Sequence, residues 1–267
     1  MKPLKIIGLS ALALIGAGIL YSLLKSKTLS LAAKTGRWLT FSPSYCLGSV
    51  MSIPLPAVTD QFYDDSQVQP NADRIAQMEA DYGSYVQTIA TLTNLPAALI
   101  YAFMFIESAG NSMVVNGSAI GLMQISVTAA TDIVFNEYHH GRLNSGEAEI
   151  LSRNLGDRLQ QIYAMKSPGT ASVITAADLF NAELNILLGA IYLGQLIDES
   201  TSTDGLRLDK VIVRYNIGYF SFSRGRQLVG DIATVMGKVN PITRNYIAKM
   251  IGKNGILETC QALHCNG

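Results

Sequence analysis

Charge is scarce in this chain of 267 residues. Only 15% of the residues are charged, the 20 basic side chains equal the 20 acidic ones in number, and no block of basic residues occurs. Proteins that bind nucleic acids through the phosphate backbone usually carry such a basic patch. We therefore expect no nucleic-acid partner. The length suits one to two domains with a substantial core.

Cysteine and histidine are also rare, with three of each. An odd number of cysteines cannot pair completely within one chain. Cys260 and Cys265 could close a short loop in an oxidising compartment, or could remain inert thiols. His264 lies beside them and His139-His140 form a pair, but neither group has the further nearby ligands that a zinc site needs. We expect no metal and no cofactor.

Alternation of apolar and polar residues, which is typical of β-strands, is almost absent, and no internal repeat is visible. Apolar residues recur instead at three- and four-residue steps. The segment from Pro96 to Ser108 is apolar on all sides, which indicates a helix buried in the core. Helices are expected from Asn71 onward, over Pro96 to Ser108, Ala129 to Tyr138, 146–164, Asn181 to Asp198 (opened by a capping box at Thr175 to Asp178), and around Val211 to Tyr215, Leu228 to Val235 and Ile242 to Ile251.

One long uncharged run lies near the N-terminus, from Ile6 to Leu24. Its nineteen residues would span about 28 Å as a helix, close to the hydrocarbon thickness of a bilayer. A cleaved secretory signal usually has a shorter apolar region and a small-x-small cleavage site, so we favour an uncleaved anchor over residues 1–27, with a signal as the alternative. The flanking basic residues do not favour export, because four follow the segment up to Arg37 and two precede it.

The remainder divides into three parts. Residues 28–69 are interrupted by Pro43, Pro54 and Pro56 and are interpreted as a spacer. Residues 70–255 form the predicted α-rich globular domain. Residues 256–267 are expected to be a C-terminal tail.

Glu107 is the candidate catalytic residue, because it lies at the end of the apolar helix. Burial disfavours the charged carboxylate and raises its pKa, which a general acid working near neutral pH requires. The alternative is an ordinary solvent-exposed glutamate in the last turn of a helix. The residues that follow, Ile120 to Ile125, combine glycine, apolar side chains and an amide across a short loop from Glu107.

Five segments follow one another in the chain: the helix ending in Glu107-Ser108 with Asn111, residues 118–125 (SAIGLMQI), residues 181–193 (NAELNILLGAIYL), residues 215–218 (YNIG) and residues 243–247 (TRNYI). In this order they resemble the lytic transglycosylases of the soluble type, which share the goose-lysozyme type of fold. The resemblance covers roughly residues 90–252.

The resemblance implies a mostly α, lysozyme-like domain that cleaves the β-1,4 bond between N-acetylmuramic acid and N-acetylglucosamine in peptidoglycan. Glu107 would be the single catalytic residue, first as acid and then as base, and the product would be a 1,6-anhydro sugar. Ordinary glycosidases use two carboxylates, and the matched segments near Glu107 contain no second one. The residues implied to bind substrate are Ser108, Asn116, Ser118, Met123, Gln124, Tyr215, Asn216 and Tyr246.

Several roles follow from chemistry. Met123 and Gln124 would line the cleft, and Gly121 would bring the backbone close to substrate. Tyr215 and Tyr246 could each donate a hydrogen bond to the Glu107 carboxyl, or could be half-buried aromatic residues. Asn185 would cap or brace the helix beside Glu107.

The chain departs from the family pattern in two places. Many members have a serine nine residues after the acid, where this chain has Asn116, with Ser118 two positions later. In addition, 56 residues separate Gln124 from Asn181, which is more than in compact members. This insertion could form one end of the cleft or bind a partner.

Two other functions remain open at this point: a hydrolysing muramidase of the same fold, and a catalytically silent component of an envelope assembly. The expected location is the membrane, through residues 6–24, with the domain facing the periplasm or cell wall or associated with a virion. The expected partners are peptidoglycan strands and an envelope-spanning secretion, pilus or virion assembly. The sequence does not choose among these contexts.

Overall fold

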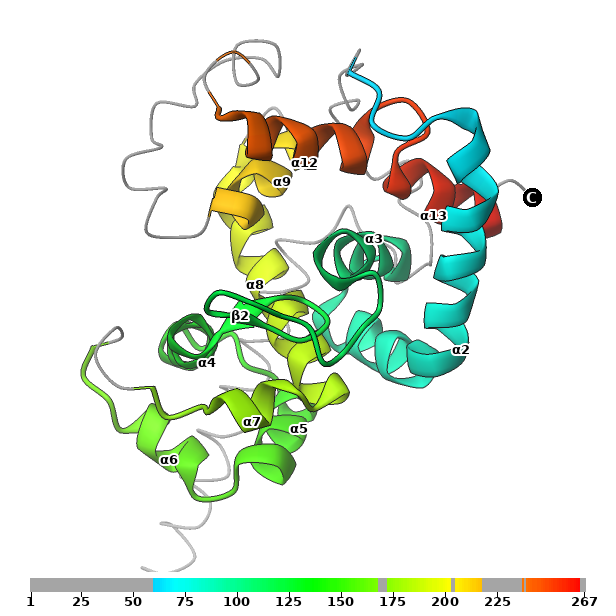
Figure 1. Cartoon of the computed structure of the whole chain (residues 1–267). Coiled ribbons are helices and arrows are strands. Elements are labelled where there is room, and N and C mark those ends of the chain that lie inside the picture. Colours follow the sequence, from blue (N-terminus) through cyan, green and yellow to red (C-terminus); the bar gives the residue numbers. More distant parts are fainter. Residues whose placement is uncertain (1–59, 168–171, 203–204, 218–236, 238, 265–267) are drawn as a thin grey trace, which may run out of the picture.

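The computed structural model describes residues 60–167, 172–202, 205–217, 237 and 239–264. This part of the chain is mostly helical, which confirms the expected α class (Figure 1). The predictions for the segment 6–24, for a helix over Leu228 to Val235, and for Cys265 concern residues outside these ranges. Of the helices in the described ranges, none has both the length and the apolar character needed to cross a bilayer.

Two helices begin the domain. A short 3-10 turn, η2 (Asp65–Gln67), leads into the long α2 (Val68–Thr93), where Pro70 lies in the first turn and needs no hydrogen-bond donor. Helix α2 ends at Asn94, whose left-handed backbone (φ 56°) lets the chain turn into α3 (Ala97–Ser108). Pro96 is the N-cap of α3.

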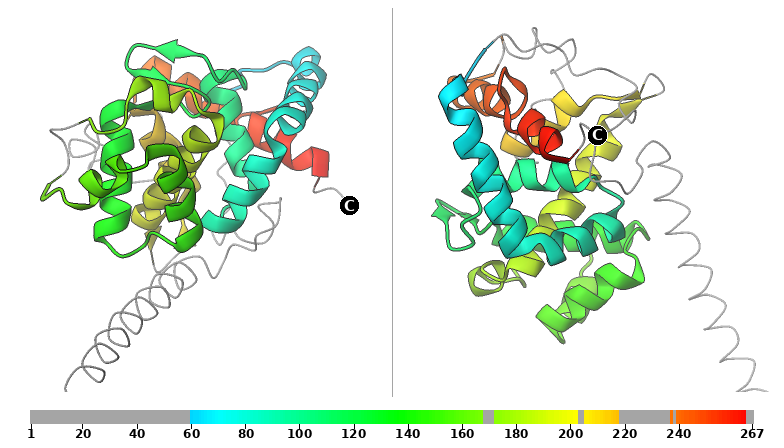
Figure 2. Two further views of the ribbon diagram at one scale, coloured as in Figure 1. Left: turned by 90° about the horizontal axis from the view of Figure 1, so that it is seen from below. Right: turned by 90° about the vertical axis from the view of Figure 1, so that its right-hand side faces the viewer.

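Helix α3 lies at the centre of the domain (Figures 1 and 2). Its residues from Ala97 to Phe105 are all buried, as the all-round apolar pattern predicts. Around it pack α2, α8 (Ala182–Ser200), α12 (Pro241–Ile251) and α13 (Ile256–His264). Helix α3 therefore packs against other helices on several sides.

A small three-stranded antiparallel sheet follows α3. Its strands β1 (Val115–Asn116), β2 (Ala119–Ile120) and β3 (Ile125–Ser126) are each two residues long. Asn116 pairs with Ala119 across the first turn, and Ile120 pairs with Ile125 across the second. Ser126 then caps α4 (Val127–His139) by accepting a hydrogen bond from the amide of Ala129.

The long insertion forms several short helices rather than one. Instead of a single helix over 146–164, the chain makes α5 (Ser145–Leu155) and α6 (Arg158–Tyr163). The break comes at Gly156, which caps α5 with a positive φ of 56°.

The capping box at Thr175 is present, but it opens a different helix from the one expected. It begins the four-residue helix α7 (Ala176–Leu179), and α8 starts separately at Ala182. Asn181 accepts a hydrogen bond from the amide of Leu184 and so provides α8 with its own start.

The remaining elements close the domain. Strands β4 (Thr201–Ser202) and β5 (Gly205–Leu206) form a second hairpin, and α9 (Leu208–Ile217) packs on both α8 and α12.

Both ends of the described chain pack onto the domain. Tyr63, in the expected spacer, is part of the core, and Asp60 bonds with Arg244 on α12. The expected C-terminal tail contains α13, whose buried Ile256, Leu257 and Cys260 contact the core. Cys260 is a free thiol, and its burial raises the thiol pKa well above the usual range.

Candidate functional site

Glu107 lies in the last turn of α3 and is the centre of the candidate site. The hydroxyl of Tyr246 donates a hydrogen bond of 2.6 Å to Oε1 of Glu107. Burial raises the pKa of Glu107 from 4.5 to about 7, while the Tyr246 hydrogen bond and the positive charge of Lys249 act in the opposite direction. A carboxyl with a pKa near 7 can hold a proton at neutral pH and release it to a substrate oxygen.

Helix α12 supplies both groups that oppose the pKa rise. Tyr246 and Lys249 are three residues apart, so both side chains extend from one face of the helix. The Lys249 ammonium lies 4.5 Å from the centre of the Phe62 ring, and Phe62 belongs to the segment that precedes α2. The buried Tyr246 hydroxyl has a strongly raised pKa, first through burial and then through the charge of Glu107, so it remains a donor.

The turn between β2 and β3 is attached to the end of α3. The hydroxyl of Ser108 lies 2.9 Å from the carbonyl oxygen of Leu122 and 3.0 Å from that of Met104. It also accepts a hydrogen bond of 3.2 Å from the amide of Gly110. Ser108 is buried, so it fixes the turn next to Glu107 and its hydroxyl is committed to the backbone.

Asn185 on α8 braces the same turn from the other side. Its Oδ1 accepts a hydrogen bond of 2.7 Å from the amide of Met123, and its Nδ2 donates to the carbonyl oxygens of Ile120 and Leu179. Gly121 is required here because its φ is 77° and a Cβ would come within 2.5 Å of Asn185 Nδ2 and of the Leu179 carbonyl. The glycine at position 121 is therefore explained by its close contact with Asn185 and the Leu179 carbonyl, and not by an approach of the backbone to substrate.

Tyr215 on α9 is the third side chain that holds the turn between β2 and β3, after Ser108 and Asn185. Its hydroxyl donates a hydrogen bond of 2.9 Å to the carbonyl oxygen of Met123, and not to Glu107 as one of the sequence hypotheses had it. The Glu107 charge nevertheless contributes to the raised pKa of Tyr215, after the larger effect of burial. The Tyr215 ring packs against Phe103 and Tyr192, with ring centres 4.6 and 5.2 Å away.

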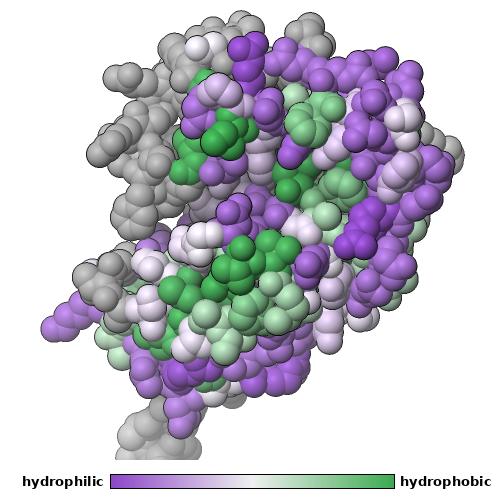
Figure 3. All heavy atoms as spheres, viewed as in Figure 1, coloured by the Kyte–Doolittle hydropathy of each residue, from purple (hydrophilic) through white to green (hydrophobic). Residues whose placement is uncertain are grey.

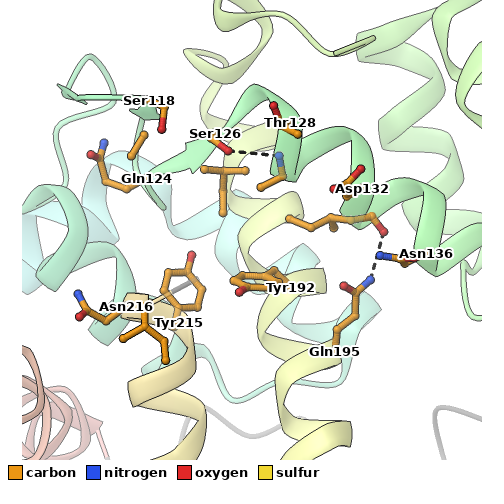
Figure 4. Close-up of a pocket in the computed structure, with 15 residues that line it drawn as sticks. Ser118, Gln124, Ser126, Thr128, Asp132, Asn136, Tyr192, Gln195, Tyr215 and Asn216 are labelled. Carbon is orange, nitrogen blue, oxygen red and sulfur yellow. Dashed lines mark hydrogen bonds between the residues drawn. The ribbon is translucent and has the colours of Figure 1, made fainter. Parts of the chain in front are cut away.

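A cavity of about 460 Å³ opens beside these residues (Figure 4). This volume is in the range of small-molecule sites. Glu107 is not among the residues that line it, but its charge acts on the hydroxyl of Tyr215, which does line it. The polar lining residues are Ser118, Gln124, Ser126, Thr128, Asp132, Asn136, Tyr192, Gln195, Tyr215 and Asn216.

The structure brings four of the predicted substrate-binding residues to this cavity: Ser118, Gln124, Tyr215 and Asn216. Gln124 has a positive φ of 48°, and its amide nitrogen donates to the backbone carbonyls of Val114 and Gly121, which leaves the side-chain oxygen as its remaining polar atom. Asn216 accepts a hydrogen bond from Thr243 on α12 and so joins α9 to that helix.

The other predicted residues lie elsewhere. The Met123 side chain is fully buried against Gly189 of α8 and does not line the cavity. Asn116 is exposed on β1, and its backbone pairs with Ala119. Met113 and Val115, just before and within β1, are exposed apolar residues. Figure 3 shows apolar surface among polar residues on the face that Figure 1 presents.

Sequence reasoning did not select the residues of α4 and α8 that line the cavity. Thr128, Asp132 and Asn136 follow one another at four-residue steps and therefore share one face of α4. Tyr192 and Gln195 share a face of α8 in the same way. The polar residues Thr128, Asp132 and Asn136, at four-residue steps directly after the 118–125 segment, form a pattern from which the α4 part of the lining could have been predicted.

His139 and His140 lie at the end of α4, where the His139 ring packs against Phe135 and the His140 ring contacts the Asn136 carbonyl. Within the ranges that the structure describes, no group of three or more His, Cys, Asp or Glu residues is arranged to hold a metal ion.

No family model matches the sequence, and no curated protein matches it at a significant level.

Proposed function

We propose that this protein is a peptidoglycan lytic transglycosylase whose described domain has the goose-lysozyme type of fold. The observation that carries the proposal is the Glu107 carboxyl, buried at the end of α3, hydrogen-bonded by Tyr246 and with a pKa raised to about 7. The charge of Glu107 acts on Tyr215, which lines a cavity whose polar side chains offer hydrogen-bonding groups to a glycan strand.

In the proposed reaction Glu107 gives its proton to the glycosidic oxygen, and the bond between C1 of the muramyl residue and that oxygen breaks. The Glu107 carboxylate then accepts the proton of the C6 hydroxyl of the same residue. The C6 oxygen forms the new bond to C1, and the product is a 1,6-anhydro sugar. Glu107 ends the cycle protonated, and no water is consumed.

A mechanism with one acid needs Glu107 to act in both protonation states. Burial raises the pKa of Glu107, and the Tyr246 hydrogen bond and the positive charge of Lys249 lower it. Tyr246 and Lys249 both favour the charged form, which is the state in which Glu107 must act as base.

The proposal includes a location. The uncharged segment 6–24 would anchor the protein in a membrane, and the domain would face the cell wall, where its substrate is found. Its partners would be peptidoglycan strands and an envelope-spanning assembly that needs the wall opened locally.

The test is digestion of purified peptidoglycan by the full-length protein, by Glu107→Gln and by the control Glu149→Gln, an exposed change of the same kind on α5. We expect Glu107→Gln to lose activity by about 10³-fold or more, and the control to keep it. Mass analysis should find the anhydro product, which is one water lighter than a reducing end.

The other outcomes decide against the proposal in different ways. Reducing ends from the wild-type protein would show a hydrolysing muramidase. Release of no fragments by the wild-type protein would favour a binding component of an envelope assembly. Equal activity of Glu107→Gln and the wild type would show that Glu107 is not the acid.

A further inference from the structure

The side chain of Asn216 lines the cavity from the end of α9 and is bonded to α12. Its Oδ1 accepts a hydrogen bond of 2.8 Å from the hydroxyl of Thr243. Because this bond engages the oxygen of the amide, the nitrogen Nδ2 is the polar atom that the side chain can present to a ligand. Asn216 therefore offers the cavity a hydrogen-bond donor.

Thr243 is itself held in place. Its side chain is 1% exposed, and its backbone amide donates a hydrogen bond of 2.9 Å to the side chain of Asn240, the N-cap of α12. The position of the Thr243 hydroxyl is thus set by burial and by the first turn of the helix. The Asn216 amide is therefore bonded to a group that has a fixed position relative to α12.

The amide of Gln124 is oriented in the opposite sense. Its nitrogen donates to two backbone carbonyl oxygens, at 3.1 and 2.9 Å, so its oxygen is the atom that remains for a ligand. Tyr215 connects the two amides, since its hydroxyl bonds to the carbonyl of Met123, the residue before Gln124, and Asn216 follows it in α9 (Figure 4). The cavity thus has an acceptor and a donor that the protein orients separately.

The same face of α12 reaches the candidate acid. Tyr246 lies three residues after Thr243, so the two side chains extend from one face of the helix. Thr243 bonds to Asn216 in the cavity lining, and Tyr246 bonds to Oε1 of Glu107. One helix therefore orients a binding group and the acid, and a variant of Thr243 has to be tested for its effect on each.

We propose that Thr243 is a positioning residue for substrate binding, whose hydroxyl holds the Asn216 amide so that Nδ2 donates to an acceptor oxygen of the bound strand. The inference rests on the proposed function for the identity of the strand. The acceptor is the acetamido carbonyl or another oxygen of the sugars. Thr243 does not touch the substrate and acts through Asn216.

The experiment measures kcat and KM of the full-length protein on peptide-free glycan strands. Thr243→Val keeps the shape of the side chain and removes its hydroxyl. It should raise KM by about five- to tenfold, the size of one hydrogen bond, and leave kcat nearly unchanged, because the contact is to an oxygen that does not react. Thr243→Ser keeps the hydroxyl and should restore KM. The control Thr259→Val removes another buried hydroxyl, bonded to the Gly255 carbonyl within α13, and should leave KM unchanged.

A second set of variants tests the route through Asn216. Asn216→Asp keeps the oxygen that Thr243 bonds and replaces the donor Nδ2 with an oxygen, so it should raise KM at least as much as Thr243→Val. In Asn216→Ala, the addition of Thr243→Val should have little further effect, because both changes remove the same contact. The alkaline limb of kcat/KM against pH should stay in place in Thr243→Val, whereas a displacement of Tyr246 would move it.

The outcomes assign the acceptor or overturn the inference. A rise in KM confined to N-acetylated strands assigns the acetamido carbonyl, and an equal rise on de-N-acetylated strands assigns another sugar oxygen. Additive losses in the double variant, a loss that Thr243→Ser does not restore, a shifted alkaline limb in Thr243→Val, or an unchanged KM in Asn216→Asp would overturn the inference.

A binding measurement separates this inference from the proposed function. Calorimetry of Glu107→Gln uses the peptide-free tetrasaccharide of alternating N-acetylglucosamine and N-acetylmuramic acid. Binding that weakens about five- to tenfold when Thr243→Val is added, and returns with Thr243→Ser, supports the positioning role even if the wild-type protein cleaves nothing. Cleavage by the wild type with equal KM in Thr243→Val would retain the function and reject the positioning role. No binding of the tetrasaccharide to Glu107→Gln would also reject it.

Discussion

At the scale of single residues, Glu107 combines two opposing influences. Burial at the end of α3 favours the neutral acid, while Tyr246 and Lys249 favour the carboxylate. The result is a pKa of about 7, where the group can both give and take a proton. A reaction in which one side chain is first acid and then base needs this balance.

Tyr246→Phe is expected to move the pH dependence of activity. The Tyr246 hydroxyl lowers the pKa of Glu107 by donating to its carboxylate, so its removal should raise that pKa further. The alkaline limb of the profile of kcat/KM against pH should therefore move to higher pH. Tyr85→Phe, on the exposed side of α2, serves as the control. A limb that stays in place or moves to lower pH would contradict the role given to Tyr246.

Glu107 should also make the stability of the fold depend on pH. The pKa is raised on folding, so the folded state keeps a proton that the unfolded state releases, and stability falls as pH rises from about 4.5 to about 7. A rise from 4.5 to about 7 corresponds to a loss of about 3 kcal/mol.

Glu107→Gln does not titrate, so its free energy of unfolding should exceed that of the wild type increasingly across this window. The two should be closest below pH 4.5. Denaturant unfolding at several pH values measures the difference. Parallel stability curves for the two proteins would show that the Glu107 pKa is not raised on folding.

At the scale of elements, the turn between β2 and β3 is held by three helices. Ser108 of α3, Asn185 of α8 and Tyr215 of α9 each bond to the backbone of residues 120–123. Gln124 follows directly and lines the cavity. The position of the turn between β2 and β3 therefore depends more on the packing of these three helices than on the pairing of the short strands.

Two glycines inside helices should respond oppositely to alanine. At Gly189 on α8 a Cβ would lie 2.6 Å from several atoms of the Met123 side chain, so Gly189→Ala should cost about 1 to 3 kcal/mol and displace the turn. At Gly83 on α2 the nearest atom would be the Tyr101 hydroxyl at an ordinary 3.7 Å. Gly83→Ala should therefore stabilise the helix by about 0.5 to 1 kcal/mol.

Thermal or denaturant unfolding of the two variants measures this contrast. Activity gives a second reading, since only Gly189→Ala should alter the site. If both alanines stabilise the protein, the close packing of Met123 on α8 is refuted.

At the scale of the whole molecule, α3 is enclosed by segments from both ends of the described chain. Tyr63 and α13 belong to the same core as α3, although they lie near opposite ends of the described sequence. Helix α13 is therefore expected to contribute to the stability of the described domain.

Leu257→Ala tests this contribution. Leu257 is 1% exposed in α13, so its truncation should cost about 2 to 5 kcal/mol in free energy of unfolding. Leu263 on the same helix is 39% exposed, and Leu263→Ala should change stability by about 0.5 kcal/mol or less. Equal effects, measured by denaturant unfolding, would show that α13 does not pack as described.

The sequence by itself determined the α class, the buried helix that ends at Glu107, and the expectation of a raised pKa. These features depend on local periodicity and on an acid placed at the end of an apolar run, and both can be seen in consecutive residues. The same holds for the capping box at Thr175, although the length of the helix it opens did not follow, because the Asn181 side chain starts α8 separately by accepting a hydrogen bond from the amide of Leu184.

Only the tertiary structure decided which side chains meet. Tyr246, which is 139 residues from Glu107, reaches its carboxyl, whereas Tyr215 reaches the Met123 carbonyl, and the sequence treated the two tyrosines alike. Met123 points into the core because α8 has a glycine opposite it. Asp132 reaches the cavity because α4 turns one face towards α8. Such choices depend on helix orientation, which is set by contacts between distant segments and not by the local pattern.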